Sequence, residues 1–274
     1  GAFVSTDNSS FFDNRALEKG GACAFTAATI ATISNSLFAN NTAKGLGGGA
    51  VYSDKSSLAL NNLHCRNNTA LSGGGGALYW DTVQPQMDSN LCSGGGNMAK
   101  YGNCIATSYA SLIASETPKI LYPGVLFTVS MMKSDFYHHT ITSDSQSNVQ
   151  VMGLSSVGGE YKVDSEISVS GSFIGVFSEG VASMTVAMKP KYQYVDTQKG
   201  ITQLIAPLVL LVTGTDVETG RVMNLGPFSP NLATGFNVCP RGYTLSLETA
   251  DANGGRRGSC SLCGIQQYSV SPLA

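Results

Sequence analysis

Residues 1–108 contain six carboxylates that could act as general acids or bases on a polysaccharide. They are Asp7, Asp13, Glu18, Asp54, Asp81 and Asp88. Hydrolysis of a glycosidic bond needs two carboxyl groups that converge on one face, and only Asp54 and Asp81 share a 27-residue spacing that recurs in this part of the chain. A lyase would need a calcium-binding carboxylate cluster and a basic proton acceptor, which the sequence does not suggest. We therefore predict solvated turn carboxylates, no catalytic residue and no enzymatic activity.

The three histidines could bind a metal ion only if several of them converged. His138 and His139 are adjacent, so on a strand their side chains would point to opposite faces. His64 is isolated in the sequence. We predict no metal site and no cofactor.

The composition indicates which elements would position these groups. Only 12% of the 274 residues are charged and the net charge is −2, which argues against a nucleic-acid partner or a polybasic membrane surface. A chain with 32 glycines, many Ser, Thr and Asn residues and 42% apolar residues is typical of an all-β protein with many turns. No stretch reaches the ~20 apolar residues that a membrane-spanning helix needs, so we predict no transmembrane segment in this chain.

A 27-residue repeat organises the part of the chain from position 1 to position 108. An apolar-x-x-Asn segment begins at Phe11 and Phe38 and, with cysteine in the first place, at Cys65; Cys92 lies one further period along the chain. A second segment, Gly-Gly-Ala followed by an apolar residue, recurs with it. A fixed period with short β segments between turns predicts one solenoid coil per repeat, with equivalent residues stacked ~4.8 Å apart. We predict a right-handed parallel β-helix, whose tight corners lie at the glycine runs 73–76 and 94–96.

The register of the repeat assigns two columns of stacked side chains. An inward column should contain Phe11, Phe38, Cys65 and Cys92. An amide ladder at a turn should contain Asn14, Asn41 and Asn68. Alternation along the chain then points the preceding residues, Asn40 and Asn67, outward.

The pairing of F-x-x-N with G-G-A-[apolar] resembles the repeat of polymorphic outer-membrane proteins and related β-helix surface proteins. Phe11 to Asn14 and Phe38 to Asn41 match the first motif in full, while the third copy has Cys65 in place of phenylalanine. The resemblance covers residues 1–108 and implies a β-helix and a cell-surface setting, not a reaction. The transporter barrel of the bacterial members has no counterpart in this chain.

Three asparagines open N-x-S/T sequons, namely Asn8, Asn40 and Asn67. The outward position of Asn40 and Asn67, on neighbouring coils, favours N-glycosylation if the protein is eukaryotic and secreted. We expect covalent N-glycans at these two residues and, with less support, at Asn8.

The second half of the sequence contains a different pattern. Short runs rich in β-branched residues alternate with turn signals, as in Val125–Met132, Val149–Met152 and Leu204–Val212. Several short strands at this spacing predict an Ig-like antiparallel β-sandwich. We therefore predict three domains: a β-helix over 1–108, a sandwich over 109–238 and a small disulfide-rich tail over 239–274.

The tail resembles the start of an ephrin-receptor-like cysteine-rich module, a unit found in extracellular multidomain proteins. This resemblance implies a Cys239–Cys260 disulfide, with Cys263 awaiting a partner beyond Ala274. Zinc is the competing interpretation, but three cysteines with no nearby histidine fall short of the four ligands of a tetrahedral site. Because the first residues look like the end of an earlier repeat and the last ones stop inside this motif, we expect both termini to be cut edges.

The other four cysteines lie in the predicted β-helix. Cys65 and Cys92 share a column one coil apart, at a Cα spacing that permits a disulfide. Side-by-side stacking makes their Cβ vectors parallel, so a Cys92–Cys104 bond across one coil is the alternative. Cys23 should be a buried thiol in the column of Val51 and Leu78.

These features favour an extracellular structural glycoprotein, a subunit or segment of a cell-surface filament, flagellar hair or matrix, with copies of itself or sister subunits as partners. An open solenoid end would expose unpaired strand edges to them. The alternative is an adhesin that binds a glycan or a receptor, for which an aromatic groove near Tyr52, Tyr79 and Trp80 is the expected sign. A polysaccharide-active enzyme is the third hypothesis and would require converging carboxylates.

Overall fold

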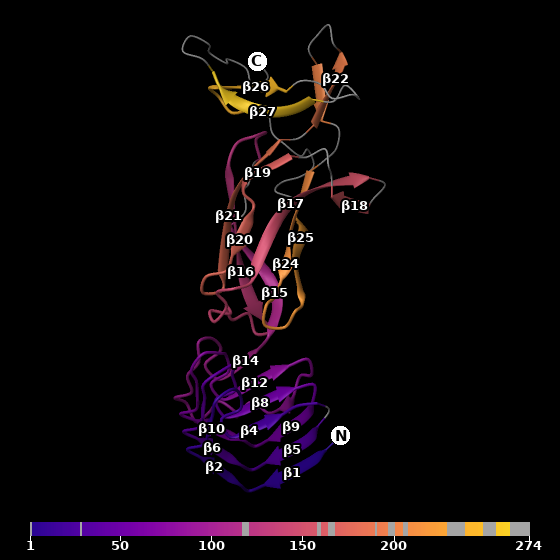
Figure 1. Ribbon diagram of the computed structural model, residues 1–274. Coiled ribbons are helices and arrows are strands. Elements are labelled where there is room, and N and C mark those ends of the chain that lie inside the picture. The colour runs from indigo at the N-terminus through magenta and orange to yellow at the C-terminus, as the bar shows by residue number, and fades with distance from the viewer. Residues whose placement is uncertain are drawn as a thin grey trace. The chain divides into compact units, whose positions relative to one another are not determined.

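The computed structural model (Figure 1) describes residues 2–27, 29–116, 121–157, 160–163, 168–189, 191–196, 201–204, 208–228, 239–248 and 256–263. Every element in these ranges is a β strand, as the composition predicts, and none is a helix long and apolar enough to cross a membrane. The chain divides into two compact units. The first unit comprises residues 1–111, 133–145 and 178–181, and the second comprises residues 112–132, 146–177 and 182–274.

The first unit is a parallel β-solenoid of about four coils, built from four stacks of short strands (Figure 1). The first stack contains β1 (Phe3–Asp7), β5 (Ile30–Ser34), β9 (Ser57–Asn61) and β13 (Gln86–Met87). The second contains β2 (Ser10–Phe12), β6 (Leu37–Ala39) and β10 (His64–Arg66). The third contains β3 (Arg15–Ala16), β7 (Thr42–Ala43) and β11 (Thr69–Ala70). The fourth contains β4 (Cys23–Phe25), β8 (Val51–Asp54), β12 (Leu78–Asp81) and β14 (Ile105–Thr107).

The register between coils agrees with the 27-residue repeat. Phe3 pairs with Ile30, and Ile30 pairs with Ser57. In the fourth stack Cys23 pairs with Val51, which is one position further along the chain than the 27-residue period gives. The cause is the connection after β3, which is one residue shorter in the first coil than in the second. This shortening is the physical reason why the first Gly-Gly-Ala segment is one residue out of step in the sequence.

Four columns of residues with a left-handed backbone mark the corners between the four strand stacks. The three non-glycine columns, with φ between 47° and 73°, are Asn8, Asn35 and Asn62; Asp13, Asn40 and Asn67; and Ala27, Lys55 and Thr82. The glycine column is Gly20, Gly48, Gly75 and Gly102. Asn and Asp tolerate this conformation better than most residues, and at Gly75 a Cβ would lie 2.1 Å from the Leu78 carbonyl oxygen. Asparagine and aspartate therefore mark two of the four corners at which the coil changes direction.

The interior of the solenoid is filled by columns of stacked apolar side chains. The rings of Phe11 and Phe38 lie parallel with centroids 4.5 Å apart, and Cys65 continues their column without solvent exposure. Val51 and Leu78 form a second buried column, and Cys23 pairs in register with Val51 as predicted. Cys23 is only half-buried, which corrects the prediction of a buried thiol, because no described coil covers it on the outer side of the first coil.

The predicted amide ladder runs through the solenoid and has one more member than the sequence suggested. Asn14 Nδ2 donates to Asn41 Oδ1, and Asn41 Nδ2 donates to Asn68 Oδ1, both at 2.9 Å. Asn68 Nδ2 then donates to Asn97 Oδ1 at 3.0 Å. Each Oδ1 also accepts the backbone N–H of the preceding ladder residue, at 3.0 to 3.1 Å. The ladder thus ties every coil to the next through side chain and backbone together.

Residues 133–145 cover the last coil and belong to the same unit as the solenoid. The fully buried Asp135 accepts a hydrogen bond on Oδ2 from the Thr107 N–H (3.2 Å) and, on Oδ1, from the N–H groups of Tyr137 (2.9 Å) and His139 (2.8 Å). Trp80 Nε1 donates to Tyr137 Oη at 3.1 Å. This segment, named here the end cap, supplies the partners that a fifth coil would otherwise provide to β14.

Two disulfides are formed within the described residues. Cys92 bonds Cys104, with Cα atoms 5.9 Å apart, and Cys239 bonds Cys260, with Cα atoms 5.5 Å apart. The predicted Cys65–Cys92 bond is wrong and its alternative is correct: Cys65 remains a free thiol inside the column. Stacked residues point the same way, whereas Cys104 approaches Cys92 from another part of the coil.

The second unit consists of antiparallel sheets, as the second half of the sequence predicts. One sheet has the order β15 (Tyr109–Glu116), β16 (Phe127–Asp135), β21 (Val181–Lys189) and β19 (Ser168–Ser172). Another has the order β18 (Glu160–Val163), β17 (Asn148–Val157), β24 (Leu208–Thr215) and β25 (Val222–Phe228), with β20 (Ile174–Val176) paired to β17. A third has the order β23 (Ile201–Leu204), β22 (Lys191–Asp196), β27 (Arg256–Leu262) and β26 (Tyr243–Leu247).

Several strands of this unit coincide with the predicted apolar runs, for example β16, β17 and β24. β15 lies at the start of the predicted 109–238 domain, before the first of the apolar runs named above. The end cap lies inside the predicted 109–238 domain but packs with the solenoid.

Candidate functional site

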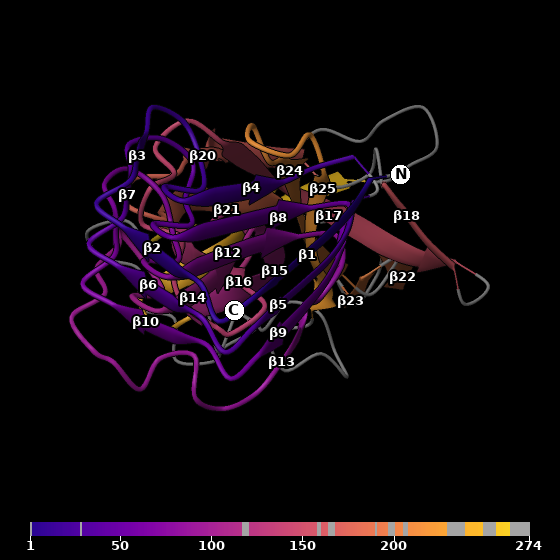
Figure 2. The ribbon, with the colours of Figure 1, turned by 90° about the horizontal axis from the view of Figure 1, so that it is seen from below.

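The exposed corner beside the amide ladder is the candidate site on the solenoid. Asn40 and Asn67 are exposed, have φ values of 58° and 54°, and stand on neighbouring coils of the same corner. The backbone N–H of Asn40 donates to the Arg66 carbonyl oxygen at 3.2 Å, which fixes the two residues one coil apart. Figure 2 shows the outline of these stacked coils from the side of β1, β2 and β4. Both sequon asparagines therefore present their amides from adjacent, rigidly positioned turns.

The amide ladder lies immediately inside this corner. Asn41 and Asn68, which follow the two sequon asparagines, have no solvent exposure and use their amides within the solenoid. The chain thus places one asparagine outward and the next inward on each coil. The outward direction was predicted from strand alternation, but the left-handed corner is its actual cause.

Asn8 stands at a different corner. It is exposed and has a φ of 47°, and its column continues with Asn35 and Asn62. Asn62 Nδ2 donates to Asn35 Oδ1 at 2.9 Å, and Asn35 Nδ2 donates to Asp7 Oδ1 at 2.9 Å. The repeated Asn at positions 8, 35 and 62 was a detectable signal for this second ladder, which the sequence analysis missed.

The aromatic groove expected of an adhesin is absent from the place predicted for it. Tyr52, Tyr79 and Trp80 are only 6%, 1% and 7% exposed. The rings of Tyr52 and Tyr79 stack on each other 5.5 Å apart, and Trp80 belongs to the solenoid interior. These side chains stabilise the coils and cannot line a groove open to solvent.

Two of the six carboxylates come together on neighbouring coils. Asp54 and Asp81 pair in register in the fourth stack. Asp54 Oδ1 accepts a hydrogen bond from Thr82 Oγ1 at 3.3 Å, and Asp81 Oδ1 accepts one from Ser108 Oγ at 2.5 Å. Hydrogen bonds from these hydroxyl groups give both carboxylates a structural role at the strand ends.

The adjacent histidines lie in the end cap. His139 Nδ1 is 3.1 Å from Asp135 Oδ2, and both His138 and His139 are exposed. Within the described residues, no three His, Cys, Asp or Glu side chains are grouped in a way that could hold a metal ion.

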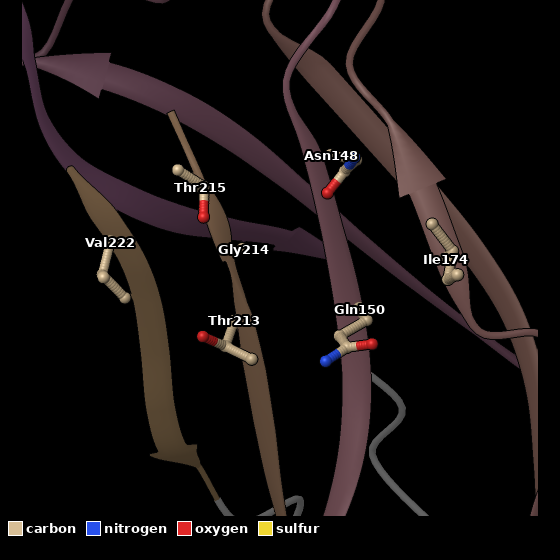
Figure 3. A pocket seen from close by; sticks show the side chains of 7 residues that line it. All are labelled: Asn148, Gln150, Ile174, Thr213, Gly214, Thr215 and Val222. Carbon is tan, nitrogen blue, oxygen red and sulfur yellow. The ribbon is translucent and has the colours of Figure 1, made fainter. Parts of the chain in front are cut away.

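A shallow pocket of about 430 Å³ lies on the sheet formed by β20, β17, β24 and β25 of the second unit (Figure 3). Asn148 and Gln150 of β17 lie directly across from Thr215 and Thr213 of β24. Three further residues complete the lining: Ile174, Gly214 and Val222. The lining contains no charged group, so it offers amide and hydroxyl partners between two exposed apolar side chains.

The free thiols differ in their chemistry. Burial raises the pKa of the Cys65 thiol to about 12, and it also raises the pKa of the half-buried Cys23. The thiolate is the reactive form of cysteine, so Cys65 is an inert member of the interior column. Cys263 is also unpaired and half-buried, but it lies in the tail.

We predict that iodoacetamide will modify Cys263 in the folded protein at neutral pH and will leave Cys65 unmodified until the protein is denatured. Peptide mapping by mass spectrometry, before and after denaturation, measures both sites in one sample. Rapid modification of Cys65 in the folded state would contradict its placement in the column.

Comparison with known proteins yields no match to a protein-family model, to a curated protein or to a solved structure.

Proposed function

We propose that the chain is an extracellular structural glycoprotein, a subunit or segment of a surface filament, flagellar hair or matrix. The stacked corners of the solenoid carry this proposal, because Asn40 and Asn67 are exposed at left-handed turns on neighbouring coils. The asparagine ladder inside these corners holds each coil on the next. A solenoid with such a row of turns at its surface is suited to a structural role and to the display of glycans.

Two further observations support an extracellular location. Disulfides persist in oxidising compartments, and the chain has Cys92–Cys104 and Cys239–Cys260. The motif resemblances, to the repeat of polymorphic outer-membrane proteins and to the ephrin-receptor-like module, support a place at the cell surface. Both resemblances rest on the motifs in the sequence.

Electron microscopy of native material tests the assembly. We expect filaments or ordered arrays that persist when salt is raised, because a chain with 12% charged residues has little scope for ionic contacts. Monodisperse particles at high protein concentration, or dissociation in moderate salt alone, would contradict the proposal.

We predict that Asn40 and Asn67 carry N-glycans in native protein. N-glycans are attached to asparagines at the protein surface, and both of these side chains are exposed on turns. Mass spectrometry of glycopeptides, with and without glycosidase treatment, measures their occupancy. Asn40→Gly is the matched control, because glycine accepts the positive φ of this corner while removing the acceptor amide. Unmodified Asn40 and Asn67 in native protein would remove the support for a secreted eukaryotic glycoprotein.

A second candidate function is glycan binding, and the pocket on β17 and β24 favours it. Its amides and hydroxyls could hydrogen-bond a neutral saccharide, while Ile174 and Val222 contact the apolar face of a sugar ring. Saccharide titration observed by nuclear magnetic resonance should shift the signals of Gln150 and Thr213. A glycan array without binders would argue against this candidate.

A further inference from the structure

Three cysteines of the last two coils lie together in the solenoid interior. Cys65 is a fully buried free thiol and belongs to the interior apolar cluster. Cys92 and Cys104 form a disulfide, and both pack against that cluster. The Cys65 N–H donates to the Leu91 carbonyl oxygen at 3.1 Å, which places Cys92, the next residue, beside Cys65 on the following coil. A free thiol is thus a neighbour of a disulfide.

Cys65 is covered by a turn and not by a strand. In the second stack β10 pairs with β6, and Cys65 lies over Phe38, but the fourth coil then places a turn at 89–94 over β10. Gly94 of this turn approaches closely, since a Cβ there would lie 2.8 Å from the Cys65 carbonyl oxygen. Gly95 is exposed, and a Cβ there would have no atom within 4 Å. The cover over Cys65 is therefore a glycine-containing turn whose outer side faces solvent.

Such a turn can open without unwinding the solenoid. Its carbonyl oxygens at Leu91 and Gly95 accept the N–H groups of Cys65 and Asn67, both at 3.1 Å. Segments held by few backbone contacts open at a lower free energy than the whole protein unfolds, and glycine gives the backbone further freedom. Opening would admit water to Cys65 and remove the burial that raises its pKa to about 12. The thiolate, which is the reactive form, would then be available beside Cys92.

We propose that Cys65, Cys92 and Cys104 form a thiol–disulfide exchange unit, in which Cys65 attacks Cys92 when the turn opens and the disulfide moves from Cys92–Cys104 to Cys65–Cys92. Cys65 first gives its proton to water. Its sulfur then bonds Cys92 Sγ while the Cys92–Cys104 bond breaks, and Cys104 leaves as a thiolate that takes up a proton. One disulfide replaces another, so the exchange consumes no oxidant and no reductant.

The exchange changes both the crosslink and the free thiol. Cys92–Cys104 closes a segment of 12 residues within the last coil, whereas Cys65–Cys92 would join two neighbouring coils. The closed turn favours the first pairing, because stacked side chains point the same way, so the second pairing belongs to the open turn. Cys104 is half-buried, unlike Cys65. The unit thus converts an inert interior thiol into one that reagents in solution can reach.

The test uses the full chain with Cys23→Ala and Cys263→Ala, so that Cys65 is the one free thiol. The protein is incubated in urea below the unfolding transition seen by tryptophan fluorescence, treated with iodoacetamide and mapped without reduction. We expect a Cys65–Cys92 peptide and labelled Cys104 to accumulate roughly tenfold faster than the solenoid unfolds globally, at a rate independent of protein concentration. The matched control adds Cys65→Ala to this background and should keep the Cys92–Cys104 bond intact.

A second variant, Cys104→Ser, tests whether Cys65 reaches Cys92 at all. Its natural disulfide cannot form, so the thiol oxidant diamide should bond Cys65 to Cys92 in the same urea concentration. Absence of that bond would overturn the proposal, and so would a Cys65–Cys92 peptide in the first experiment that appears only after the solenoid has unfolded. A Cys65–Cys104 peptide with labelled Cys92 would overturn the assigned attack at Cys92. Each readout is a disulfide map of single chains, so it does not depend on filament formation.

Discussion

Replacing Asn68 with alanine should destabilise the solenoid by ~3 kcal/mol or more, since each buried polar group left without a partner costs ~1–3 kcal/mol. Asn68 has no solvent exposure, and its amide donates to both Asn97 Oδ1 and the Phe38 carbonyl oxygen at 3.0 Å. Its Oδ1 accepts the Nδ2 and backbone N–H groups of Asn41. Alanine would leave the Asn41 backbone N–H and one Nδ2 hydrogen of Asn41 without their acceptor in the interior, and the Phe38 carbonyl oxygen would lose the Asn68 amide.

Urea unfolding observed through Trp80, the only tryptophan in the sequence, measures this loss. The control is Asn14→Ala, which changes the same residue type in the same ladder at its exposed end. It should cost only ~1 kcal/mol, the net value of one hydrogen bond, because the Asn14 backbone N–H still donates to Asn41 Oδ1. Equal losses for the two variants would show that the ladder does not stabilise the interior.

Replacing Lys133 with methionine should cost ~3–5 kcal/mol, as expected when one partner of a buried ion pair is removed. The Lys133 Nζ lies 2.7 Å from Asp144 Oδ2, and the two side chains are 1% and 8% exposed. The substitution would leave the Asp144 carboxylate buried without this cation. The double variant Lys133→Met with Asp144→Leu should recover much of the stability, because neither charge then remains buried.

An exposed ion pair of the same length provides the comparison. Lys189 Nζ lies 2.7 Å from Glu248 Oε1, with side chains 34% and 46% exposed. The hydrogen bond and charge of Lys189 lower the pKa of Glu248. The stabilising effect of this pair is therefore present at neutral pH and is lost as the pH falls through the lowered pKa. Lys189→Met should cost under ~1 kcal/mol by calorimetry, and a loss as large as that of Lys133→Met would contradict the burial argument.

The regular part of the solenoid could be predicted because its chemistry repeats. The Phe11 column and the Asn14 ladder recur with a constant offset, and the stacking of identical residues requires that regularity. The offset changes in the fourth coil, where Asn97 lies 29 residues after Asn68. Two extra residues near the 94–96 glycine run therefore hid the fourth ladder member from a search at a fixed period.

The end cap could not be predicted, because its partners are distant in sequence and occur only once. Asp135 meets Thr107 across 28 residues, and Trp80 meets Tyr137 across 57 residues. No period connects these pairs. The partner of Cys92 was also hard to predict from the repeat. Cys65 lies one coil away in the same column, at a suitable Cα spacing, but stacked side chains point the same way, and Cys92 bonds Cys104 instead.

The stacking of coils along one axis also determines how the solenoid would respond to mechanical tension. A pull on the first coil would load the hydrogen bonds of one coil at a time, so the strands would peel away in sequence. Each 27-residue coil would then release up to roughly 90 Å of extended chain. The Cys92–Cys104 bond would withhold the residues between these two cysteines from that extension. The last coil would thus lengthen less than the coils before it when the solenoid is pulled apart.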